Sequence, residues 1–115
     1  MKRGDVHTVA GGKHYAGKPR PVVIVQDDAF DVTDSVTVCP FTTDETEAPL
    51  FRLRVEPTAR NGLRETSRLM VDKITTAPKR TVGARIGRLD DEDILRLNRA
   101  VLVFLGLAVS PTGRR

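Results

Sequence analysis

The stretch Lys18-Pro19-Arg20-Pro21-Val22-Val23-Ile24-Val25-Gln26 decides the fold. Each proline fixes its own φ and pushes the preceding residue towards extended geometry, so Arg20 has little backbone freedom. The run from Val22 to Val25 is apolar on both faces, which predicts a central strand covered on both sides. A guanidinium can donate two parallel hydrogen bonds, so a stiffly held Arg20 at the mouth of this strand is a candidate phosphate-binding group. A solvated basic turn before a core strand is the alternative interpretation.

Composition indicates one small domain with an anionic partner. The chain has 115 residues and a net charge of +4, so we expect a single domain over 1–115, with a flexible tail at 108–115. Residues 27–47 carry seven carboxylates and no Lys or Arg, whereas residues 52–88 carry ten Lys or Arg and three carboxylates. This separation predicts one face that binds a polyanion and another that repels it.

Cysteine usage and the start of the chain indicate a cytoplasmic protein. The single Cys39 cannot form an intramolecular disulfide, which favours a reducing compartment. The N-terminus leads into no apolar signal-peptide region, and no apolar run approaches membrane-spanning length. The two histidines and the cysteine lack ligand-like spacing, so we expect no structural zinc site and no cofactor.

Alternation and turn residues predict further strands at 4–9, 35–41, 50–55, 67–74 and around 82–89, with breaks at 10–17, 57–62 and 77–78. The strand at 35–41 is expected to end or bulge at Pro40, which cannot donate to a ladder. Residues 50–55 alternate most cleanly, with Arg52 and Arg54 pointing outwards. Asp72 shares a face with Arg68. Two interpretations of Asp72 stay open: a partner in a surface ion pair, or a residue of a functional site.

A helix is predicted from Asp90 onward, because an acidic N-cap precedes apolar residues at helical spacing. The stripe consists of Ile94, Leu97, Val101 and Phe104 or Leu105. Gly106 is expected to end the helix, with Leu107 packing back against it. Asp27 is expected to cap one short helical turn after the central strand.

The glycine-rich segment 10–17 holds Lys13, His14 and Tyr15 together. Cations beside an aromatic ring suit single-stranded RNA, where bases stack and phosphates need neutralising. A mobile surface loop with polar residues explains the segment equally well. We expect His7 to be a strand residue near the surface, and the pair Thr42 and Thr43 is typical of a turn or cap.

Several segments align in order with one known family. They are Arg3-Gly4-Asp5-Val6, residues 20–25, residues 38–43, Gly62-Leu63 followed by Ser67, Asp72, Ile86-Gly87-Arg88-Leu89 with its helix, and Leu105-Gly106-Leu107. With these segments the chain resembles the MazF/PemK family of toxin endoribonucleases over roughly residues 3–107. The resemblance implies a mainly β fold with α: a small SH3-like β-barrel with a C-terminal helix, working as a homodimer.

The resemblance also implies metal-independent cleavage of single-stranded RNA at a short sequence. The family's essential arginine and threonine fall on Arg20 and Thr42. A loop histidine and a strand aspartate of the PemK branch fall on His14 and Asp72. This chain has Met70 where that branch has an arginine, and Lys73 where the family usually has a glutamine. These departures favour the simpler site of one arginine and one threonine.

The implied reaction is attack of the RNA 2′-OH on the adjacent phosphorus, giving a 2′,3′-cyclic phosphate and a 5′-OH. Arg20 would stabilise charge on the phosphorane and Thr42 would donate to the same phosphate. Among these residues only His14 has an unperturbed pKa suited to proton transfer near neutrality. Further RNA contacts are expected from Lys13, Tyr15, Lys18, Arg52, Arg54 and Ser67.

The resemblance implies one more partner, a cognate antitoxin with an acidic disordered tail, which would suit a basic groove. Two alternative functions stay open. A CcdB-like gyrase poison shares the barrel and the dimer, but that family relies on a C-terminal tryptophan and this chain has none. A barrel that binds RNA without cutting it is the other alternative.

Overall fold

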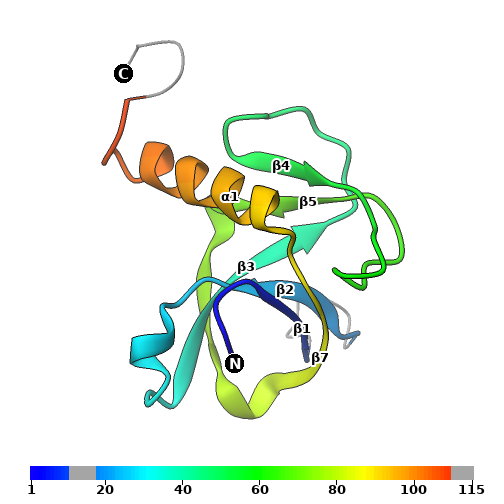
Figure 1. Ribbon diagram of the computed structural model, residues 1–115, viewed down its shortest axis with the longest axis vertical. Helices are drawn as coiled ribbons and strands as arrows, with labels where there is room; N and C mark the ends of the chain where they lie inside the picture. Colours follow the sequence, from blue (N-terminus) through cyan, green and yellow to red (C-terminus); the bar gives the residue numbers. More distant parts are fainter. Residues whose placement is uncertain (11–17, 110–115) are drawn as a thin grey trace.

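The computed structural model describes residues 1–10 and 18–109, which form an antiparallel sheet of seven strands and one C-terminal helix (Figure 1). The elements are β1 (Asp5–Val9), β2 (Arg20–Ile24), β3 (Ser35–Thr42), β4 (Arg52–Val55), β5 (Ser67–Met70), β6 (Thr75–Pro78), β7 (Val82–Arg88) and α1 (Asp91–Phe104). The strand order is β4-β5-β3-β2-β1-β7, and β6 pairs with β3. The two outer strands do not pair within the described residues, so the barrel-like sheet is open. The predicted mainly β class with a C-terminal helix is confirmed.

Strand β2 is buried on both faces, as the sequence predicts. Val23 belongs to a core cluster shared with α1, β3, β4 and β5, whereas Val22 and Ile24 belong to a second cluster with β3 and Ala77. Val23 is 0% exposed and Ile24 is 1% exposed. The side chains of one strand therefore join the two halves of the hydrophobic core.

Helix α1 begins and ends where the sequence predicts, with Asp90 at the N-cap and Gly106 in the left-handed region at φ +76°. Leu97 and Ala100 are buried against the sheet. Leu107, however, is 71% exposed, and its backbone amide bonds to the Leu102 carbonyl. The predicted packing of Leu107 is therefore wrong, because the turn at Gly106 is closed by the backbone. No helix among the described residues is long and apolar enough to cross a membrane.

The region after β5 differs most from the sequence prediction. The strand expected at 67–74 stops at Met70, and Val71–Lys73 form a 3-10 turn before β6 begins. β3 pairs with β6 through residues 35–38 and with β5 through Phe41 and Thr42. Pro40 lies between these two partners and pairs with Val22 of β2. The expected end or bulge at Pro40 is wrong, because β3 changes partner there without ending. The expected break at 77–78 is also wrong, because both residues belong to β6 and pair with β3.

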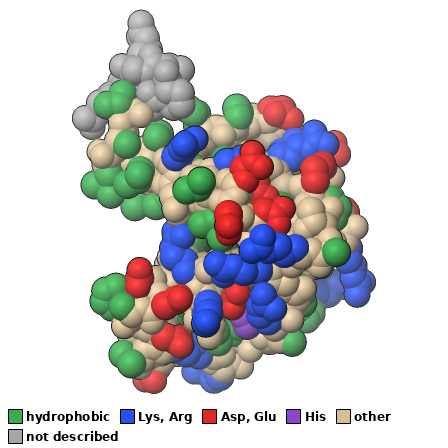
Figure 2. All heavy atoms as spheres, in the orientation of Figure 1, with side chains coloured by type: hydrophobic (Ala, Val, Ile, Leu, Met, Phe, Trp, Pro, Cys, Tyr) green, Lys and Arg blue, Asp and Glu red, His purple; other side chains and the backbone are tan. Residues whose placement is uncertain are grey.

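The predicted separation of charge into two faces is also wrong. Glu47, from the acidic segment, pairs with Arg68 at 2.9 Å, and Asp31 pairs with Lys79 at 3.1 Å. On the face drawn in Figure 2, Lys and Arg side chains lie next to groups of carboxylates. Runs of charge that are separate in the sequence thus meet in the folded chain.

The loop between β4 and β5 lies in close contact with β7. Gly62 has φ +72°, and a Cβ added there would lie 2.0 Å from the Ile86 carbonyl oxygen. Asn61 is fully buried, and its Oδ1 accepts from the amides of Thr58 and Leu63. The loop is therefore held in one conformation by internal hydrogen bonds and by a backbone approach that only glycine permits.

We predict that Gly62→Ala destabilises the protein more than Gly106→Ala does. Both glycines have positive φ, at 72° and 76°, so both substitutions carry a conformational cost of about 1 kcal/mol. Nothing lies within 4 Å of a Cβ at Gly106, so only Gly62→Ala adds a clash, which costs about 1–3 kcal/mol more. Urea unfolding of both variants measures the difference, and equal losses would contradict the close approach.

Candidate active site

Arg20 opens onto a pocket of about 590 Å³ where segments from five parts of the chain meet. The entry to β2, the end of β3, the β4–β5 loop, β1 and β7 all contribute. The lining residues with polar or charged side chains include Lys18, Arg20, Thr43, Arg64, Glu65 and Ser67. Three cations and one carboxylate give this pocket a positive balance, which suits an anion.

Strand register relates Arg20 to Thr42. β2 and β3 are antiparallel, with Val22 opposite Pro40; continuing that register by two residues brings Arg20 opposite Thr42. Thr42 is not itself among the lining residues of the described pocket, but its neighbour Thr43 is. The arginine and threonine predicted from the resemblance therefore lie on facing strand ends.

The hydroxyl of Thr42 is oriented by the backbone that follows it. Its Oγ1 accepts a hydrogen bond of 3.1 Å from the amide of Asp44. Because that bond uses an oxygen lone pair, the hydroxyl hydrogen remains able to donate to a bound anion.

Ser67 and Lys18 contribute to the same pocket in different ways. Ser67 is 4% exposed, and its Oγ donates to the Glu65 carbonyl at 3.0 Å. This bond fixes the end of the β4–β5 loop, so Ser67 shapes the pocket wall. Lys18 is exposed and presents a mobile point charge at the entrance.

Arg52 and Asp72 form a bidentate ion pair with each other. Arg52 Nε lies 2.8 Å from Asp72 Oδ1, and Nη2 lies 2.9 Å from Oδ2. The hydrogen bonds from Arg52 lower the pKa of Asp72 despite its partial burial, and the same contact raises the pKa of Arg52. Arg54 is exposed and pairs with Glu56 at 3.3 Å. None of these side chains lines the Arg20 pocket.

The remaining titratable candidates lie elsewhere. Lys13, His14 and Tyr15 fall outside the described residues.

His7 is 8% exposed, so the expectation of a residue near the surface is wrong; its Nδ1 lies 3.0 Å from the Gly83 carbonyl. Burial, together with the charge of Asp72, raises the pKa of Cys39 to about 12, so this thiol is not a nucleophile. No group of three His, Cys, Asp or Glu among the described residues could hold a metal ion.

Arg64 and Glu65 are pocket residues that the sequence analysis missed. They lie in the β4–β5 loop between Gly62 and Ser67. Gly62 and Ser67, which flank these two residues, belong to the segments that resemble the family. Their place in that resemblance is the one sequence signal that points to this loop. The loop faces Arg20 because it contacts β7. The sequence does not indicate that contact.

Comparisons of sequence place the chain among known proteins. The family described as "PemK-like, MazF-like toxin of type II toxin-antitoxin system" matches residues 2–105. A protein of Mycolicibacterium smegmatis named probable endoribonuclease MazF is 56% identical over 108 residues. That alignment covers 94% of this chain and 99% of the relative.

Solved structures agree with the fold. Mycobacterium tuberculosis toxin MazF-mt6 is 27% identical with a TM-score of 0.76, covering 90% of this chain and 98% of its own. A mycobacterial endoribonuclease in complex with its cognate antitoxin is 24% identical, with a TM-score of 0.77 and coverage of 94% and 97%. A MazE–MazF crystal structure from Deinococcus radiodurans is 16% identical, with a TM-score of 0.72 and coverage of 94% and 97%. The last two likenesses show the fold alone.

We predict that Asp72→Asn destabilises the protein at pH 7 by about 1–2 kcal/mol, because it removes the charge from a paired carboxylate. The pKa of Asp72 is lowered in the folded state from 3.8. Its stabilisation is therefore complete above that value and is lost as pH falls through the folded pKa. Unfolding free energies of wild type and variant, measured from pH 7 to pH 2, should converge at the acid end.

The control is the same substitution in an Arg52→Met background, where Asp72→Asn should cost little at any pH. A difference between wild type and Asp72→Asn that stays constant down to pH 2 would show that the ion pair does not stabilise the fold.

Proposed function

The chain belongs to the PemK-like, MazF-like toxin family of type II toxin–antitoxin systems, and from that premise we propose that it is an endoribonuclease that cleaves single-stranded RNA. The observation that carries the proposal is the meeting of Arg20, Lys18 and Ser67 in one cationic pocket. Thr42 ends β3, the antiparallel neighbour of β2, and the next residue, Thr43, lines the pocket.

The reaction we propose is attack of the RNA 2′-OH on the adjacent phosphorus. The bond to the 5′ oxygen of the next nucleotide breaks, leaving a 2′,3′-cyclic phosphate and a 5′-OH. This chemistry needs an in-line 2′-OH and stabilisation of charge on the phosphorane oxygens. It needs no metal ion, because fixed hydrogen-bond donors can stabilise that charge.

Arg20 is proposed to bind the non-bridging phosphate oxygens. A guanidinium holds its proton in proteins, so its role is electrostatic stabilisation and not proton donation. Thr42 is proposed to donate its hydroxyl hydrogen to the same phosphate, with its oxygen held by the amide of Asp44. His14 stays the candidate for proton transfer.

RNA contacts away from the scissile bond are assigned to two groups of residues. Lys18 and Ser67 line the Arg20 pocket, and Lys13 and Tyr15 precede it in the sequence. Arg54 is exposed and can reach a phosphate, whereas Arg52 would first have to leave its ion pair with Asp72. Asp72 is therefore proposed as the partner that orients Arg52.

The proposal extends to partners and compartment. We propose a cytoplasmic homodimer that is inhibited by a cognate antitoxin with an acidic disordered tail. The solved relatives include an endoribonuclease with its cognate antitoxin and MazE–MazF complexes. An acidic segment would complement the positive balance of the Arg20 pocket.

Incubation with one long single-stranded RNA tests the function directly. Discrete fragments carrying 2′,3′-cyclic phosphate and 5′-OH ends are expected. Retention of intact RNA would instead indicate a binding protein. If the RNA is neither bound nor cut, the gyrase-poison alternative is favoured. Sequencing the 5′ ends of the fragments would also give the recognised RNA sequence.

We predict that Arg20→Ala lowers the cleavage rate at least about a hundredfold, as expected for loss of one preorganised donor to the transition state. The side chain is exposed, so circular dichroism and thermal unfolding should match the wild type. Arg80→Ala is the matched control, since Arg80 is also an exposed arginine but lies outside this pocket. Cleavage by Arg20→Ala close to the wild-type rate would remove the central assignment.

We also predict that cleavage persists in EDTA. Charge stabilisation by Arg20 and Thr42 requires no divalent cation, so the rate should change less than about twofold after correction for ionic strength. A magnesium-dependent ribonuclease treated in parallel confirms that chelation is complete. Loss of cleavage in EDTA that Mg²⁺ restores would replace this mechanism by a metal-assisted one.

A further inference from the structure

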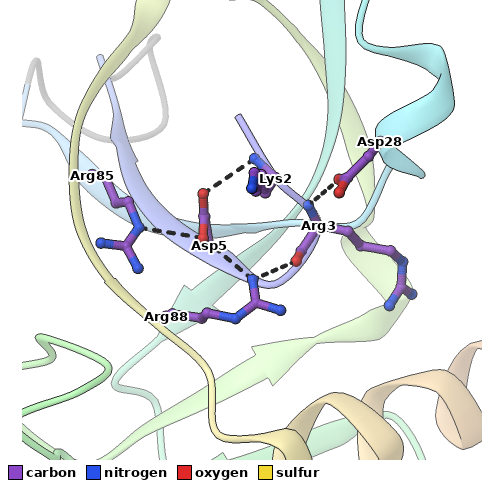
Figure 3. A pocket seen from close by; sticks show the side chains of 6 residues that line it. All are labelled: Lys2, Arg3, Asp5, Asp28, Arg85 and Arg88. Carbon is purple, nitrogen blue, oxygen red and sulfur yellow. Dashed lines mark hydrogen bonds and ion pairs between the residues drawn. The ribbon is translucent and has the colours of Figure 1, made fainter.

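A second charged pocket lies away from Arg20, between the N-terminal segment and β7. It has a volume of about 460 Å³. Figure 3 shows the side chains that line it, which are Lys2, Arg3, Asp5, Asp28, Arg85 and Arg88. They come from the start of the chain, from β1 and β7, and from the 3-10 turn Asp28–Phe30 that follows β2 and is capped by Asp27.

This pocket and the Arg20 pocket lie on opposite faces of β1. Asp5 lines the second pocket, whereas Thr8 lines the Arg20 pocket. The two residues are three positions apart on one strand, and successive strand residues point to opposite faces. The second pocket is therefore separate from the proposed cleavage site.

One buried carboxylate organises the second pocket. Asp5 is 7% exposed, and its Oδ1 lies 3.2 Å from Arg85 Nε and 3.3 Å from Arg88 Nη1. Its Oδ2 accepts from the amide of Lys2, and Arg88 Nη1 also donates to the Arg3 carbonyl. Burial alone would raise the pKa of Asp5, but the Lys2 amide and the two arginines lower it, so the group stays ionised near neutral pH.

The charges in this pocket are not balanced. Four cations face two carboxylates, and Asp28 is occupied by the backbone amide of Arg3 at 2.7 Å. Arg85 and Arg88 share a single oxygen of Asp5, so two like charges are held side by side. A bound anion would relieve that repulsion.

Several donors in the pocket remain available. Within the described residues, the Lys2 ammonium and the terminal Nη atoms of Arg85 have no protein acceptor. Among the described residues, the Arg3 guanidinium donates through Nε alone, to the Val25 carbonyl at 3.0 Å. Donors of Lys2, Arg85 and Arg88 thus line one cavity, whereas the Arg3 guanidinium points away from Asp5 (Figure 3).

We propose that this pocket binds a phosphate group. A phosphate offers three or four oxygens in a tetrahedral arrangement, which suits donors from several directions better than the two coplanar oxygens of a carboxylate. The phosphate belongs either to a phosphodiester of an RNA that continues from the Arg20 pocket or to free phosphate or a nucleotide. Only the RNA form rests on the proposed endoribonuclease function.

The first experiment titrates inorganic phosphate into the full-length Arg20→Ala protein, so that the other pocket is weakened. Shifts of the arginine side-chain Nε–H resonances in ¹⁵N spectra report which guanidinium groups respond. Arg85 and Arg88 signals should shift, and adding Arg85→Gln should weaken binding about tenfold. Arg80→Gln is the matched control and should leave affinity unchanged, because Arg80 does not line the pocket.

Absence of phosphate-dependent shifts at Arg85 and Arg88, or equal affinity with Arg85→Gln, would overturn the proposal whether or not the protein cleaves RNA. A polyglutamate peptide that binds the same residues as tightly as phosphate would also overturn it, in favour of an acidic protein segment.

The second experiment identifies the source of the phosphate. RNA affinity of the Arg20→Ala protein is measured at several salt concentrations, with and without Arg85→Gln. A phosphodiester contact predicts that Arg85→Gln lowers the slope of log affinity against log salt by about 1. An unchanged slope together with weakened phosphate binding assigns the site to free phosphate or a nucleotide.

Discussion

The burial of β2 on both faces is the constraint on which the rest of the structure depends. Val23 packs into one core cluster and Val22 and Ile24 into the other, so a slip of one residue would exchange the two sets. The register with β1 and β3 is fixed for that reason, and it places Arg20, the first residue of β2, at the same end of the sheet as Thr42, the last residue of β3. The position of the candidate catalytic arginine thus follows from hydrophobic packing.

Elements with strong local patterns could be predicted from the sequence. The central strand, the short turn capped by Asp27 and helix α1 were predicted because apolar periodicity and capping residues act over a few positions. The sequence does not predict β6 or the continuity of β3 through Pro40, because both depend on β3 exchanging one partner strand for another. A local pattern does not record which distant strand lies alongside.

The residues of the candidate site also differ in how well the sequence predicts them. Arg20, Lys18 and Ser67 were predicted, and they meet in one pocket. Arg52 and Asp72 were predicted as RNA-binding and catalytic candidates, yet they face each other, because β4 pairs with β5 and the following 3-10 turn carries Asp72 onto Arg52. Arg64 was missed since its place depends on the close backbone approach of Gly62 to β7. The surroundings of Arg52, Asp72 and Arg64 therefore depend on tertiary contacts, which the residue types alone do not predict.

The two cationic pockets orient their arginines by different physical means. Prolines on either side of Arg20 restrict its backbone where β2 begins. Arg85 and Arg88 are instead held by the charge of Asp5, which neutralises part of the field that an incoming anion would feel. A carboxylate shared by two arginines gives a stable resting site with weaker attraction for an incoming anion, which suits reversible binding.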